Sequence, residues 1–175
     1  MTTEPPTLVS ARLRLRPHRL DDFESIVQQW SDPAVVAHFG GRPFSREDSW
    51  NRLLRYAGHW QLLGFGIWAV TRADGDRHIG DVGFLDGQRT GVPALGGPEA
   101  AWSFQSAVHG QGLAGEAVAC ALAWGEQRFA RITAMINPAN APSIALARRA
   151  GFSLYGSAFY KAAPVGLWQR VRTAP

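Results

Sequence analysis

HGQGLAGEAV, residues 109–118, places three glycines and an alanine within seven positions and then continues into an apolar stretch. Apolar residues recur at helical spacing from Leu113 onward, so a helix is expected to begin directly after the glycines. The first N–H groups of a helix have no partner within it, and the helix dipole adds positive potential at that end. Because glycine leaves these groups uncovered, the segment predicts a phosphate-binding loop. A sharp turn and a flexible lid are the alternative interpretations.

The chain around this loop alternates between strand and helix patterns and predicts a single α/β (α+β) domain over residues 1–175. Expected strands cover residues 11–16, 65–71, 78–85, 99–108, 131–137, 152–160 and 165–171. Expected helices cover about residues 20–30, 45–63, 113–129 and 142–150. Ser45 is the expected N-cap of the second helix, and Gly64 is expected to end it. Residues 1–7 are expected to form a loose arm, and the long loop 86–98 is a functional candidate.

Composition excludes several functional classes. The formal net charge is +4, and Lys161 is the only lysine, so the positive charge is almost all arginine. These arginines are scattered along the chain, which argues against a nucleic-acid partner. Cys120 is the only cysteine, so no intrachain disulfide can form, and a cytoplasmic location is expected. The absence of a long apolar run argues against a membrane. No His, Cys or carboxylate group has metal-ligand spacing, so no metal is expected.

Two nucleotide-binding motifs were compared with the glycine segment. No Gly-Lys-Ser/Thr follows it, so it is not a P-loop. Gly110, Gly112 and Gly115 match the Rossmann pattern G-x-G-x-x-G, which leaves a dinucleotide-binding oxidoreductase as an alternative. A Rossmann unit should stand after the first strand and be followed about 20 residues later by an acid. Met135 and Ile136 occupy the corresponding region here, so the match is incomplete.

The segment 109–114 resembles the acetyl-CoA signature of the GNAT superfamily of N-acetyltransferases, and Glu116-Ala117 continues the resemblance. Further elements are similar to the branch that includes bacterial ribosomal-protein N-terminal acetyltransferases, and they span nearly the whole chain. They are Arg12-Leu-Arg-Leu-Arg16 with Asp22-Phe23, Gly64-Phe-Gly-Ile-Trp68, Ile79-Gly80, Asn137-Pro-Ala-Asn140-Ala-Pro-Ser143 and Ala150-Gly151-Phe152. His109 stands where the family has Gln, Arg or Trp. Ala147 replaces the tyrosine that many members use as an acid.

The resemblance implies a GNAT-like fold, with a mixed, mostly antiparallel sheet of about seven strands that splays in the middle and about four flanking helices. Acetyl-CoA is the implied cosubstrate, with its pantetheine arm between the strands at 99–108 and 131–137. The cofactor-binding residues it implies are Ser106, Ala107, Val108, His109, Gly110, Gln111, Gly112, Leu113, Ala114, Gly115 and Asn140.

Glu99 is the first candidate for a general base, acting through water, with a solvated strand-end carboxylate as the alternative. Ser143 is the candidate acid for the leaving thiolate, by resemblance to the branch's serine, with Tyr155 or Tyr160 as alternatives. Asn140 and Ser143 could each be a helix N-cap instead. His109 and Asp81 are weaker catalytic candidates, and Cys120 is expected to be inert packing.

The expected function is an acetyl-CoA-dependent N-acetyltransferase that acts on a primary amine, either a protein N-terminus or a small molecule, by direct attack in a ternary complex. A catalytically degenerate acyl-CoA-binding sensor or structural partner is the alternative. The sequence leaves the oligomeric state open, with a homodimer as one alternative. Trp30, Trp50, Trp60 and Trp168 are candidates for the acceptor pocket, although helical spacing makes the first three more typical of core.

Overall fold

The computed structural model describes residues 5–172 and contains one mixed sheet of eight strands in the order β1-β2-β3-β4-β5-β6-β8-β7. All neighbouring strands run antiparallel except β5 and β6, which are parallel. The strands are β1 (Leu8–Val9), β2 (Leu13–Arg16), β3 (Ile67–Arg72), β4 (His78–Leu85), β5 (Glu99–Phe104), β6 (Arg131–Ile136), β7 (Ser153–Tyr160) and β8 (Ala163–Val171). The predicted single-domain α/β fold is confirmed, with one strand more than expected.

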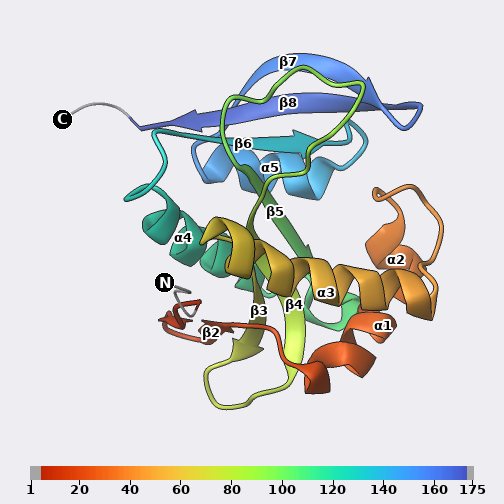
Figure 1. Cartoon of the computed structure of the whole chain (residues 1–175), viewed down its shortest axis with the longest axis vertical. Helices are drawn as coiled ribbons and strands as arrows, with labels where there is room; N and C mark the ends of the chain where they lie inside the picture. Colours follow the sequence, from red (N-terminus) through yellow and green to blue (C-terminus); the bar gives the residue numbers. More distant parts are fainter. Residues whose placement is uncertain (1–4, 173–175) are drawn as a thin grey trace.

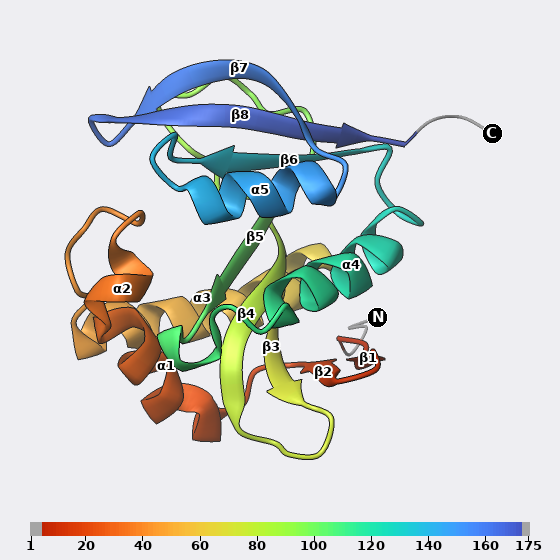
Figure 2. The same ribbon diagram turned by 180° about the vertical axis from the view of Figure 1, so that it is seen from behind.

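Helices cover both faces of this sheet (Figures 1 and 2). On one face lie α4 (Leu113–Gly125) and α5 (Ala141–Arg149), and on the other lie α1 (Phe23–Ser31), α2 (Pro33–Val36) and α3 (Arg46–Leu63). Loop 86–98 passes over the face that carries α3. Two 3-10 turns, η1 (Leu20–Asp22) and η2 (Ser106–Val108), complete the list of elements. No helix among residues 5–172 is long and apolar enough to cross a bilayer.

Local capping chemistry sets the helix limits that the sequence predicted. Ser45 caps α3 in a reciprocal capping box with Asp48, and Gly64 ends the helix with a φ of 70°. At α5, the side chain of Asn140 accepts the Ser143 N–H, so Asn140 is the N-cap and the capping interpretation of Ser143 is wrong.

Several element limits differ from the prediction. The strand expected over 99–108 ends at Phe104. Its partner β4 begins at His78, and the bond from the Gln105 N–H to the Ile79 carbonyl is the last one between the two segments. The helix expected to reach residue 129 ends at Gly125, where a Cβ would lie 2.5 Å from Phe84 Cζ. The short elements β1 and α2 lack a periodic signal and were missed.

Part of the expected N-terminal arm is anchored to the sheet. The Nε1–H of Trp68 donates to the carbonyl of Pro6 over 2.8 Å, so the prediction of a loose arm is wrong at this residue. Residues 1–4 of the arm lie outside the described residues.

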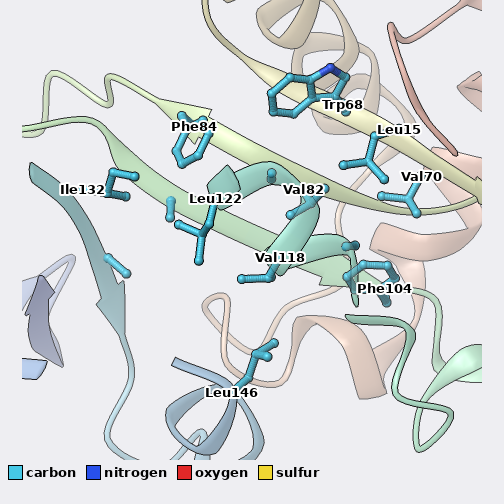
Figure 3. Close-up of a cluster of buried hydrophobic side chains, with 14 of the residues drawn as sticks. Leu15, Trp68, Val70, Val82, Phe84, Phe104, Val118, Leu122, Ile132 and Leu146 are labelled. Carbon is cyan, nitrogen blue, oxygen red and sulfur yellow. The ribbon is translucent and has the colours of Figure 1, made fainter. Parts of the chain in front are cut away.

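The main core lies between the sheet and α4, where Val118 and Leu122 face the strand side chains (Figure 3). Phe84 is 1% exposed and lies among aromatic rings, with ring centroids 5.5 Å from Phe129 and 6.1 Å from Trp124. This packing fixes α4 on the sheet, and with it the glycine loop that precedes α4.

We expect Phe84→Ala to lower the free energy of unfolding by about 3–5 kcal/mol, because it leaves a cavity that the surrounding rings fill only in part. Urea denaturation followed by tryptophan fluorescence measures the change. Val171→Ala, at a position 55% exposed, is the control and should stay within about 0.5 kcal/mol of the unmodified protein. A Phe84→Ala loss as small as the control's would show that this core tolerates a cavity.

Candidate acetyl-CoA and acceptor site

The sheet opens into a wedge between β5 and β6. Within the described residues these strands pair only at Glu99 and Thr133, and beyond this point they diverge. The Gln105 N–H bonds the Ile79 carbonyl, so the backbone of Gln105 faces β4. Strand alternation therefore turns the backbone groups of Trp102 and Phe104 toward the wedge, where no strand lies opposite them. The Phe104 carbonyl accepts from His109 there, so the groups of Trp102 and the N–H of Phe104 remain without a partner strand. Unpaired groups of this kind can bind an extended ligand.

The glycine loop lies between η2 and α4, at the wide end of this wedge. Gly110 and Gly112 have φ values of 74° and 73°, a left-handed conformation that favours glycine. Gly112 is the N-cap of α4, and no described side chain caps the helix. A Cβ on Gly110 would meet nothing within 4 Å, so the loop surface is open. The free N–H groups of the first turn of α4 therefore form a site suited to a phosphate.

Two arginines hold this loop in place. The Arg12 guanidinium donates to the Gln111 carbonyl over 3.0 Å and to the Glu116 carboxylate over 2.7 Å. Arg72 donates to Gln111 Oε1 over 2.7 Å. They bring positive charge to the predicted phosphate site, and neither was a predicted site residue. Arg12 and Glu116 are 104 residues apart, so no local pattern joins them.

Side chains at the entrance of the loop bind other parts of the protein. The Nε2–H of His109 donates to the carbonyl of Phe104 over 2.9 Å, which ties the loop to the end of β5. The Ser106 hydroxyl donates to Asp32 at the start of α2. Only the backbone and the open surface of residues 106–109 are thus left for a ligand, as expected for a cradle built from N–H groups.

Across the wedge, Ser143 in α5 faces β5. Its hydroxyl oxygen accepts the Nε1–H of Trp102 over 3.3 Å. The predicted residues Asn140 and Ser143 therefore meet at the N-terminus of α5, where Asn140 acts as the cap. Ala147, one turn farther along, is fully buried in the core. The position at which many family members have a proton-donating tyrosine therefore holds only the methyl group of Ala147.

Comparison with known proteins agrees with this geometry. The family model of the acetyltransferase (GNAT) domain matches residues 12–153. The chain belongs to the GNAT acetyltransferases. GNAT proteins use acetyl-CoA, so this GNAT protein is an acetyltransferase with acetyl-CoA as its cosubstrate. The dinucleotide-binding interpretation of Gly110, Gly112 and Gly115 is thereby replaced.

Three similar proteins illustrate the relationship. The uncharacterized N-acetyltransferase p20 of Bacillus licheniformis is 29% identical over 154 residues, which cover 86% of this chain and 84% of that protein. A structure from Bordetella pertussis, assigned to the GNAT-family acetyltransferases, is 28% identical, with a TM-score of 0.80 over 95% of this chain and 99% of that one. The ribosomal L7/L12 alpha-N-protein acetyltransferase RimL, solved with coenzyme A, shares the fold at 17% identity, with a TM-score of 0.76 over 95% of this chain and 98% of that one.

On the face of the GNAT sheet opposite α5, Glu99 lies at the apex of the wedge. It is 6% exposed, and its two carboxylate oxygens accept from Arg89 Nε and Nη2 over 2.7 and 2.8 Å. The alternative of a solvated carboxylate is therefore wrong. Tyr160 lies against Arg89, and Tyr155 lies against Arg131, each ring centroid within 5 Å of the guanidinium. These tyrosines contact a different set of residues from Ser143.

Beneath the helices of this face lies a buried polar network. Asp81 Oδ1 lies 2.8 Å from Nε2 of both His18 and His78, and Gln29 Nε2 donates to Asp81 Oδ2 over 2.8 Å and to Ser103 over 3.0 Å. Burial opposes ionisation of Asp81, but the two histidines outweigh it and hold the pKa of this carboxyl well below its usual value. The network joins α1 to β4 and β5, and it makes Asp81 a structural anion rather than a base.

The same network places three atoms that could bind a metal within 4.8 Å of one another, one each from His18, His78 and Asp81. The spacing of these residues in the sequence did not predict this group. His18 is 63 residues from Asp81. Hydrogen bonds already engage both carboxylate oxygens of Asp81, and they account for this grouping without a metal ion.

The remaining candidates are mainly core residues. Trp30, Trp60 and Trp168 are at most 4% exposed, as their spacing suggested for the first two. Trp50 is 37% exposed and packs edge-on against Phe23. Cys120 is half-buried beside the core, and burial raises the pKa of its thiol, which suits the packing role expected of it.

We expect Asp81→Asn to lower the free energy of unfolding by about 3–5 kcal/mol near neutral pH, because both histidines lose a shared buried carboxylate. Since folding lowers the pKa of Asp81, its contribution is present above the unfolded value of about 3.9 and disappears as the pH falls further. The difference between the two proteins measured at pH 5 should therefore shrink as the pH falls below 4. A difference independent of pH in acid would contradict this assignment.

We expect Gly112→Asp to weaken acetyl-CoA binding at least about tenfold relative to Gly112→Asn, because only the first adds negative charge beside the free N–H groups. Both side chains tolerate the left-handed backbone, so Asn is the matched control. Calorimetry with acetyl-CoA measures the affinity, and circular dichroism verifies folding. Equal affinities for the two variants would remove the phosphate assignment from this loop.

Proposed function

We propose that this protein transfers the acetyl group of acetyl-CoA directly to a primary amine within a ternary complex. The observation that best supports this proposal is the wedge between β5 and β6, with the uncapped N-terminus of α4 at one end. A diphosphate bound at the loop would direct the thioester along the free backbone groups of β5. The amine would then approach from the face that carries α3 and loop 86–98.

In the proposed reaction, the neutral amine forms a C–N bond with the acetyl carbon, and the C–S bond breaks. The amine loses one proton, and the departing thiolate takes up one. Alignment of two bound reactants can supply about 7–11 kcal/mol, so side-chain catalysis need not be large. An α-amine, with a pKa near 8, is partly neutral at pH 7 and suits such a site better than a lysine-like amine.

Glu99 remains our candidate base, acting through water, but its ion pair with Arg89 restricts how it can accept a proton. Its carboxylate is held by Arg89, so it can accept a proton only if that ion pair opens or if water bridges from the amine to one of its oxygens. This arrangement supports acceptors that need little deprotonation. A protein N-terminus, the acceptor named for RimL, fits that requirement, as does a small α-amine.

Ser143 is our candidate acid for the thiolate. The Trp102 N–H occupies one lone pair of its hydroxyl oxygen, which leaves the hydroxyl proton available for donation into the wedge. The position of Ser143 across the wedge from β5, together with the absence of a tyrosine at 147, supports this choice.

Thiol release from acetyl-CoA, measured against a panel of amines and N-terminal peptides, tests the proposal. Release that depends on the amine, with acetylated product identified by mass spectrometry, is the expected result. Tight coenzyme A binding without transfer to any amine would overturn it and favour the alternative of an acyl-CoA sensor.

We expect Ser143→Ala to lower kcat by about 100-fold, the lower end of the range for proton transfer, with little change in the affinity for acetyl-CoA. Ser143→Thr keeps the hydroxyl and should retain most of the activity. Steady-state kinetics with the best amine of the panel measures both variants. An unchanged kcat in Ser143→Ala would assign the serine to the structure of α5 alone.

A further inference from the structure

Three arginines gather on the acceptor face of the wedge. Arg52 and Arg55 lie one turn apart on α3, and Arg89 lies in loop 86–98. His59 Nε2 lies 3.2 Å from the carbonyl of Asp86, which places the start of this loop against α3. We call Arg52, Arg55 and Arg89 the arginine patch.

Arg52 is held rigidly without a carboxylate partner. Its guanidinium lies 3.7 Å from the ring centroid of Trp30 and 4.9 Å from that of Phe44. Its Nη1 donates to the Tyr56 hydroxyl over 3.2 Å, while its buried Nε–H has no partner in the described chain. Burial raises the pKa of Tyr56 to about 12, so the hydroxyl stays neutral and does not cancel the charge of Arg52. A guanidinium fixed between aromatic rings and left unpaired is preorganised for an anion.

Arg55 is also without an ion-pair partner among residues 5–172. Partial burial lowers the pKa of the Arg55 guanidinium first, and the charges of Arg52 and Arg89 lower it further, while the charge of Glu99 opposes them. An anion placed among them would relieve their repulsion.

The acidic groups nearby are bound to other partners. Glu99 neutralises Arg89 in a bidentate pair. Asp48 is engaged in the capping box with Ser45, and Asp81 is saturated by its own network beneath Tyr56. Asp86, at the start of loop 86–98, accepts from Gln88. Arg52 and Arg55 therefore form no ion pair with a carboxylate among the described residues.

The patch also lies where an acceptor would pass. Arg89 bonds Glu99 at the apex of the wedge, and its guanidinium lies 4.7 Å from the ring of Tyr160 near the tip of the β7–β8 hairpin. Helix α3, loop 86–98 and this hairpin thus meet at the face opposite the Trp102–Ser143 contact.

We propose that the arginine patch selects amine acceptors that carry a carboxylate a few bonds from the amine. This inference rests on the acetyl transfer proposed above and names the class of its acceptor. Arg52 and Arg55 bind the carboxylate, and the amine of the same molecule points toward the apex of the wedge.

Matched acceptors test the inference. The peptide pair Ala-Glu-Ala-Ala-amide and Ala-Gln-Ala-Ala-amide differs only in the carboxylate, and 4-aminobutyrate and its amide form the corresponding small-molecule pair. The amine pKa of each is measured so that rates are compared per neutral amine. We expect kcat/KM to favour the acidic member about tenfold or more in at least one pair, as for a charge-assisted bond.

Substitutions in the arginine patch then test whether it causes the preference for the acidic acceptor. Arg55→Gln should reduce the preference toward unity through a higher KM for the acidic acceptor, and Arg55→Glu should turn it toward Ala-Lys-Ala-Ala-amide. Arg52→Lys keeps the charge but loses the fork, so it should retain part of the preference. Arg77→Gln, directly before β4 and thus at the end of this strand opposite loop 86–98, is the matched control and should leave the ratio unchanged.

The outcomes separate this inference from the proposed function. Turnover with equal kcat/KM for both members of each pair, or a preference that survives Arg55→Glu, overturns the inference and leaves acetyl transfer intact. Thiol release from none of the acceptors overturns the proposed function. Calorimetry with N-acetylated Ala-Glu-Ala-Ala-amide gives a reading independent of turnover, in which binding weaker by about tenfold in Arg55→Gln supports the patch and equal binding contradicts it.

Discussion

The molecule depends on the point at which two parallel strands stop pairing. After Glu99 and Thr133, β5 keeps its antiparallel partner β4 on one side but loses β6 on the other. Unpaired backbone groups in a protein interior are costly, so such an opening persists only where the surroundings fix it or a ligand completes it. Here the core beneath α4 fixes one side, and α5 with the β7–β8 hairpin fixes the other. Packing on both sides therefore maintains the opening between β5 and β6.

The two faces of the wedge differ in chemistry. On the side of α4 and α5, the glycine loop offers backbone N–H groups, and the Trp102–Ser143 contact bridges the gap. On the other side, side chains provide the polarity, with Arg89 and Glu99 at the apex and a buried hydrogen-bond network around Asp81 beneath α1. Strand alternation alone produces this division, because Glu99 and Trp102 point to opposite faces of β5.

Local signals in the sequence predicted much of the fold. Ser45 and Gly64 mark the ends of a helix through bonds within a few residues, and the limits of β4 follow from a strand with clear turns at both ends. The glycine loop was also predicted, because its left-handed backbone and the uncapped helix end depend on residues within the loop itself. The sequence could not predict side-chain hydrogen bonds between distant segments, such as those of Arg12 with Glu116 and His18 with Asp81. The pattern of residues 11–16 predicted a strand but not that Arg16 is buried against Asp22, six residues away.

The near absence of lysine bears on how such a protein coexists with a reactive thioester. Guanidinium groups remain protonated at any physiological pH and are poor nucleophiles, whereas a lysine amine can be acylated. Lys161, at the turn between β7 and β8, is the only side-chain amine in the chain. A surface whose positive charge is otherwise carried by arginine thus attracts anions while offering the acetyl donor a single side-chain amine that could compete with the acceptor.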